Sequence, residues 1–177
     1  MFDPTAFDNM KVVIEGALYD LDLAGEIVIT DRNDIVNLAK MSRSFDVHFQ
    51  LSSTQQGSVT AKLEIRADLI NLAAELMPNS LSQKQSGSTI KLQFFHYGIT
   101  DEAQLKKIRE IVIDIWGGTR QVSQSVTITP SISLIHNWIS IEFDRLISED
   151  QMDDLVEMID FMIKTNEQLQ SYLIDLS

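Results

Sequence analysis

The sequence contains no cysteine, and the 14 lysines and arginines are outnumbered by 26 aspartates and glutamates. Without cysteine, disulfide bonds and thiolate metal sites are excluded, and so is a small secreted scaffold held together by disulfide bridges. Glycine is also scarce, and the seven present form no phosphate-binding loop, dinucleotide fingerprint or G-x-S-x-G turn around a nucleophilic serine. We therefore identify no catalytic residue from a motif and expect no cofactor.

Clusters of basic residues are missing as well, and the formal net charge is −12 at pH 7. The acidity lies at the two ends. Residues 1–46 hold nine acidic and four basic residues, residues 142–177 hold ten and two, and the residues between them hold seven and eight. Binding to nucleic acid or anionic lipid requires clustered lysine and arginine. We therefore expect neither a nucleic acid nor a membrane as partner.

Two features that direct proteins to membranes are not seen. The segment Met1–Pro4 lacks the basic stretch and apolar core of a signal peptide, so we expect a cytoplasmic protein. The longest uncharged run, Gln121–Ile141, contains many polar residues and Pro130, and we interpret it as strands rather than as a membrane-spanning helix.

The overall composition predicts a folded chain. Hydrophobic residues make up 44% and charged residues 23% of 177 residues, which is close to the average of soluble globular proteins. This length suits one domain over residues 1–177, although a separate small subdomain over residues 1–44 is also compatible with it.

Alternating apolar and polar residues predict an antiparallel hairpin in the middle of the chain. Its strands are Phe45–Leu51 and Val59–Arg66, and each places four apolar side chains on one face. The next segment, Asp68–Met77, has helical spacing and is stopped by Pro78. Asn79–Ser88 is then predicted to be a polar loop.

A second group of elements follows this loop. Alternation predicts a strand from Ile90 to about Tyr97, and helical spacing predicts a helix from Thr100 or Asp101 to Trp116, ended by Gly117 and Gly118. Two further strands are predicted at about Gln121–Thr129 and Ile132–Phe143, with a turn at Pro130.

The first 44 residues have an ambiguous pattern. Several apolar residues lie near helical spacing, but the run Val12–Ile14 is β-branched and disfavours a helix. We predict a short helix at Pro4–Met10, strands at about Lys11–Leu23 and Glu26–Thr30 joined at Gly25, and a short helix at Asp31–Met41.

The chain is predicted to end in a long amphipathic helix from Ser148 to about Leu176. Ser148 and Gln151 match a capping box, and apolar residues then recur every three or four positions, with Asn166 interrupting the stripe. The half up to Ile163 belongs in the core. For the half from Asn166 onward, packing in the same core and contact with a partner both remain open. The expected fold class is α+β, with an antiparallel sheet packed by amphipathic helices and a long C-terminal helix.

The histidines do not form a metal-binding pattern. His48, His96 and His136 fall in three different predicted strands, and no spacing presents two of them on one face. We therefore expect no metal site.

The order of the elements from residue 45 onward supports a further comparison. The order is strand, strand, short helix, strand, helix, strand, strand and long helix. Together with the strand–strand–helix ending Gln121–Leu176 and a pI near 4.5, this order resembles the small acidic dimeric chaperones of type III secretion and the related YbjN-like domains. The N-terminal region and the Asp68–Met77 helix depart from that pattern. The resemblance implies a dimer that binds a partner polypeptide along its sheet and helices, without catalysis.

We expect a non-catalytic protein-interaction or chaperone-like module that binds a protein partner or forms a homodimer. Trp138 lies on the strand face opposite Ile139 and Ile141, and an exposed tryptophan on a sheet is typical of interfaces. The alternative is an enzyme or small-molecule binding protein with a pocket near His96 and Tyr97. The expected interface residues are Trp138, Asn166, Leu169 and Leu173.

Overall fold

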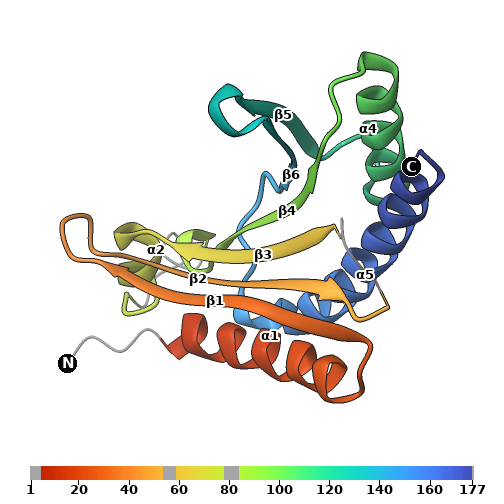
Figure 1. The fold of residues 1–177 in the computed structure, drawn as a ribbon. Helices are drawn as coiled ribbons and strands as arrows, with labels where there is room; N and C mark the ends of the chain where they lie inside the picture. Colours follow the sequence, from red (N-terminus) through yellow and green to blue (C-terminus); the bar gives the residue numbers. More distant parts are fainter. Residues whose placement is uncertain (1–4, 54–58, 78–83, 177) are drawn as a thin grey trace.

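A computed structural model describes residues 5–53, 59–77 and 84–176. Within these residues, six strands form one antiparallel sheet in the order β1-β2-β3-β4-β6-β5, and helices α1, α4 and α5 lie together on one side of it (Figure 1). The predicted α+β fold with a long C-terminal helix is therefore confirmed. The elements are α1 (Thr5–Leu23), β1 (Ile27–Asn37), β2 (Ser42–Leu51), β3 (Thr60–Ala67), α2 (Leu69–Ala74), β4 (Thr89–Tyr97), α4 (Glu102–Trp116), β5 (Gln121–Thr129), β6 (Leu134–Glu142) and α5 (Met152–Asp175).

The core lies between the sheet and the three helices. Alternate residues of the central strands point toward the helices and are fully buried, among them Phe49 of β2, Leu63 of β3 and Phe94 of β4. Ile14 of α1 and Ile159 of α5 belong to the same buried cluster. The N-terminal region therefore shares its core with the rest of the chain.

The elements predicted from residue 45 onward are confirmed with small changes at their ends. β2 and β3 form the predicted antiparallel hairpin, and β5 and β6 form the second one. Asp101 caps α4 by accepting a hydrogen bond from the backbone N–H of Gln104, at 3.0 Å. The predicted loop at Asn79–Ser88 lies partly outside the described residues, and at its end Ser88 pairs with Ile147.

The prediction for residues 11–23 was wrong. Thr5–Leu23 is one continuous helix, α1, and not a short helix followed by a strand. Phe7, Met10, Ile14 and Leu18 are completely buried, because their helical spacing places them on one stripe against the core. Burial of this stripe outweighs the modestly unfavourable helix propensity of the β-branched residues in the same segment.

The helix predicted at Asp31–Met41 was also wrong. Residues Ile27–Asn37 form β1, a strand at one edge of the sheet, which pairs with β2 from Ile27 opposite Leu51 to Asn37 opposite Ser42. An irregularity in the register between Ile29 and Asp31 interrupts the ladder. Most side chains of β1 are exposed, so its strand structure depends on backbone pairing with β2 and leaves little trace in the apolar pattern.

The C-terminal helix begins as predicted. Ser148 and Gln151 form the capping box, a short 3-10 turn follows at Glu149–Gln151, and α5 then runs to Asp175. This helix contacts α1, α4 and the strands β2 and β3. None of the described helices is long and apolar enough to span a membrane.

Candidate functional site

The face of the sheet opposite the helices, here called the open face, carries a cluster of aromatic rings. In β4 and β6, Phe95 pairs with Trp138 and Tyr97 pairs with His136, and all four side chains point to the open face. The rings of Phe95 and Trp138 meet edge to face with centroids 4.5 Å apart, and those of Tyr97 and His136 stack at 4.7 Å. These geometries are the favourable ones for aromatic pairs.

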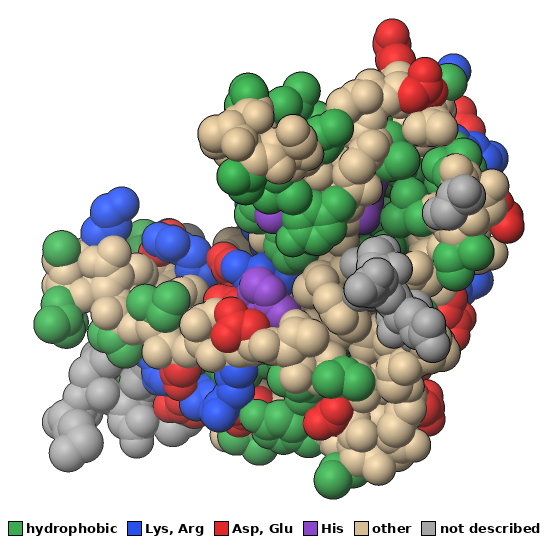
Figure 2. Space-filling model, in the orientation of Figure 1, with side chains coloured by type: hydrophobic (Ala, Val, Ile, Leu, Met, Phe, Trp, Pro, Cys, Tyr) green, Lys and Arg blue, Asp and Glu red, His purple; other side chains and the backbone are tan. Residues whose placement is uncertain are grey.

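A fifth ring reaches this cluster from β2. His48 stacks on Phe95 with centroids 5.9 Å apart. Thr60 of β3 borders the same cluster, and its hydroxyl oxygen accepts a hydrogen bond from the side chain of Gln50, at 2.7 Å. Together these residues surround a hollow of about 230 Å³. Figure 2 shows that the face is hollowed between the β1–β3 part and the β5–β6 part of the sheet, with histidine side chains lining the hollow.

Beside the hollow, the charged side chains of the open face are paired with one another. The buried carboxylate of Asp46 lies 3.0 Å from His48 Nε2 and accepts a hydrogen bond from Asn33 at 3.1 Å. Lys62 lies between two carboxylates, 3.7 Å from Asp46 and 2.9 Å from Glu64. The open face therefore combines paired charges with an aromatic hollow.

Of the two residues predicted to share a pocket, only Tyr97 lies at the hollow. Tyr97 is 53% exposed, whereas His96 is the preceding residue of β4 and points into the covered face, where it is 1% exposed. Burial, reinforced by the charge of nearby His136, lowers the pKa of His96 to about 4, so the imidazole is neutral at pH 7. The two side chains point to opposite sides of the sheet and do not share a pocket.

Trp138 lies where the alternation of β6 placed it, half-buried on the open face among Phe95 and His136. The same alternation places His136 on this face, because His136 lies two residues before Trp138 on β6, whereas His48 could not be joined to them from the sequence alone. Their strands alternate correctly, but His48 meets the cluster only through the pairing of β2, β3 and β4 in the folded sheet.

Two of the expected interface residues lie inside the chain. Asn166 and Leu169 are 0% exposed, because the second half of α5 continues across the core instead of projecting from it. Their assignment to an interface is therefore corrected: neither is exposed to a partner in this structure. Leu173 is partly buried and packs against the core.

Asn166 nevertheless has an unusual environment. Neither its Nδ2 nor its Oδ1 atom has a hydrogen-bond partner among the described residues. One turn further along α5, Gln170 is also buried, but its Oε1 atom accepts a hydrogen bond from the backbone N–H of Val59 at 2.8 Å. The same helix thus carries one satisfied and one unsatisfied buried amide.

Comparison with known proteins gives no functional assignment. No protein family model, curated protein or solved structure matches the chain. In the described part of the chain, no group of three or more histidine, aspartate or glutamate side chains is placed to hold a metal ion. Function is therefore inferred from the surfaces of the molecule itself.

Proposed function

We propose that this protein binds a segment of a partner polypeptide on the open face, and that the hollow receives a large apolar side chain of that segment. The supporting observation is the cluster of rings around Trp138, on a sheet face that no described helix covers. Tryptophan and tyrosine dominate the binding energy of many protein interfaces, since they bury large surfaces with few rotatable bonds.

The charges of the open face favour an apolar anchor. Lys62 is paired with two carboxylates, and Lys91 is paired with Glu142 at 3.0 Å. A charged ligand would have to compete with these existing pairs, so it would gain little net attraction. An apolar side chain gains free energy by leaving water, and it loses no hydrogen bond on entering an aromatic hollow.

The size and shape of the hollow favour a polypeptide segment. Its volume of about 230 Å³ is below the roughly 300–1,000 Å³ of small-molecule sites, and suits an anchoring side chain. Two copies of a concave face leave a gap when they meet, so the same face of a second copy does not fill the hollow (Figure 2). A protruding segment of a different polypeptide can fill the hollow. The homodimer expected from the sequence stays a prediction.

A selection from a display library of random peptides tests this proposal. We expect the selected peptides to share a tryptophan, phenylalanine, tyrosine or leucine anchor. In nitrogen–proton correlation spectra they should shift the indole N–H resonance of Trp138 and leave that of Trp116 in place. These are the two tryptophans of the chain, so the two resonances separate the open face from the helical side.

Replacing Trp138 by alanine should weaken binding of the selected peptides by about tenfold or more, as for a hot-spot residue. Tyr19→Ala is the matched control, because Tyr19 is a 37% exposed ring on α1, away from the open face. Peptides that bind Trp138→Ala as tightly as the natural chain would contradict the proposal. Light scattering that shows a natural dimer and a monomeric Trp138→Ala variant would instead identify a second copy as the occupant.

A further inference from the structure

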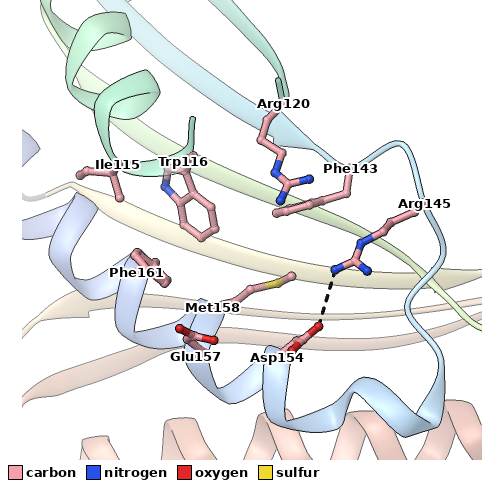
Figure 3. A pocket seen from close by; sticks show the side chains of 9 residues that line it. All are labelled: Ile115, Trp116, Arg120, Phe143, Arg145, Asp154, Glu157, Met158 and Phe161. Carbon is pink, nitrogen blue, oxygen red and sulfur yellow. Dashed lines mark ion pairs between the residues drawn. The ribbon is translucent and has the colours of Figure 1, made fainter. Parts of the chain in front are cut away.

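A second cavity lies on the helical side of the molecule, where the end of α4 meets α5 and the chain after β6 (Figure 3). Its volume is about 300 Å³, at the lower end of the range for small-molecule sites. It is separate from the hollow of the open face and shares no lining residue with it. Its size suits a ligand comparable to one amino acid.

One wall of this cavity is aromatic and held in place. The indole Nε1 atom of Trp116 donates a hydrogen bond to Thr165 Oγ1 at 2.9 Å, and Thr165 in turn donates to the backbone oxygen of Phe161 at 2.7 Å. The Trp116 ring lies 6.2 Å from Phe143 and 5.8 Å from Phe161, measured between centroids. The wall is thus formed before any ligand arrives, which lowers the entropy lost on binding.

The charged residues of the cavity are mixed in sign. Arg145 lies 3.5 Å from Asp154, so these two charges neutralise each other. The guanidinium of Arg120 lies over the Phe143 ring at 4.8 Å, and among the described residues it has no carboxylate partner. Glu157 of α5 likewise has no basic partner in the described part of the chain. In Figure 3, Arg120 and Glu157 lie on opposite sides of the cavity.

From this arrangement we infer that the cavity binds a small dipolar ligand of the amino-acid type, with a carboxylate at Arg120, an ammonium group at Glu157 and an apolar side chain against Trp116. A guanidinium stacked on a ring keeps its N–H donors at the edge, where a carboxylate accepts two of them. The charges of the four charged residues lining the cavity sum to zero, so the cavity offers no excess positive charge to a nucleotide or another polyanion, and Glu157 would repel it.

A set of four related probes tests the two charges separately. L-Phenylalanine carries both charges, hydrocinnamate only the carboxylate, phenethylamine only the ammonium group, and N-acetylphenylalanine amide neither. We expect phenylalanine to shift the Trp116 indole N–H resonance in a saturable titration. Hydrocinnamate and phenethylamine should each bind about tenfold more weakly, because each lacks one charge-assisted contact.

Two substitutions connect each charge to its residue. Arg120→Gln should weaken phenylalanine binding about tenfold and leave phenethylamine binding unchanged, whereas Glu157→Gln should weaken phenylalanine binding and spare hydrocinnamate. Arg66→Gln is the matched control, because Arg66 is an exposed arginine of the open face that pairs with Asp68 outside the cavity. It should leave all four titrations unchanged.

Two outcomes would overturn the inference. If hydrocinnamate bound as tightly as phenylalanine, Glu157 would have no part in the site. If no probe shifted the Trp116 resonance, the cavity would not be a binding site for such ligands. The inference does not depend on the proposed peptide-binding function, because the Trp138 resonance reports on the open face and the Trp116 resonance on this cavity.

Discussion

The two faces of the sheet are made of the same strands but have different partners. On the covered face, Phe94 is fully buried against the helices, whereas the next residue, Phe95, packs on the open face against His48, Trp138 and His136. Both phenylalanines are largely shielded from water. The comparison shows that low exposure alone does not identify the core: one ring packs between the sheet and the helices, and its neighbour lines the hollow of the open face.

The largest test of this comparison is the pair Phe94→Ala and Phe95→Ala. Removing Phe94 leaves a cavity in the core and should lower the free energy of unfolding by about 3–5 kcal/mol. Removing Phe95 should lower it by about 1–2 kcal/mol, because solvent can fill the space on the open face. Urea unfolding measures both values. Equal losses would mean that Phe95 belongs to the core as much as Phe94 does, and that the two faces of the sheet do not differ in this respect.

The second test uses the histidine buried on the covered face. His96 has a pKa of about 4 in the folded chain and 6.5 when unfolded, so the unfolded chain binds a proton first as the pH falls. Stability should therefore decline between about pH 6.5 and pH 4, by at most about 3 kcal/mol from this residue, and this contribution should level off below pH 4.

Replacing His96 by phenylalanine should remove this part of the pH dependence. The measurement is the free energy of unfolding of both chains across the same pH range. His48→Gln on the open face is the control, and it should leave the decline due to His96 in place. A His96→Phe variant with the same pH profile as the natural chain would show that His96 is solvated and titrates alike in both states.

The smallest expected effect concerns the two buried amides of α5. Asn166→Leu should raise the free energy of unfolding by about 1–2 kcal/mol, because it removes a buried amide that makes no hydrogen bond among the described residues. Gln170→Leu should lower it by about 1–3 kcal/mol, since the Val59 N–H would lose its acceptor. Thermal or urea unfolding reports both. A loss of stability in Asn166→Leu would show that the amide is hydrogen-bonded in solution.

The outcome for α5 shows where sequence patterns stop being informative. The start of the helix was predictable, because Ser148 and Gln151 interact within a single turn. The fate of its second half was not, because a broad apolar stripe suits the core of its own chain as well as that of a partner. Packing of α5 against α1 and across β2 and β3 decided it, and it buried Asn166 and Leu169.

The N-terminal region shows the same limit in secondary structure. The helical spacing of Phe7, Met10, Ile14 and Leu18 competed with the strand propensity of the β-branched residues, and no local rule ranks these two signals. In β1 the side chains are mostly exposed, so a pattern based on burial had little to detect. Both segments take their structure from contacts with distant parts of the chain.

By itself, the sequence determined the fold class, the hairpin at β2 and β3, the ends of α4 and the face of β6 on which Trp138 lies. These depend on local alternation, helical spacing and capping, which are physical properties of neighbouring residues. Only the tertiary structure decided which side chains meet. Strand pairing joined His48, Phe95 and Trp138 into one hollow, and helix packing brought Arg120 and Glu157 to one cavity. Such contacts depend on strand register and on the paths of loops between distant residues, and the local sequence predicts neither.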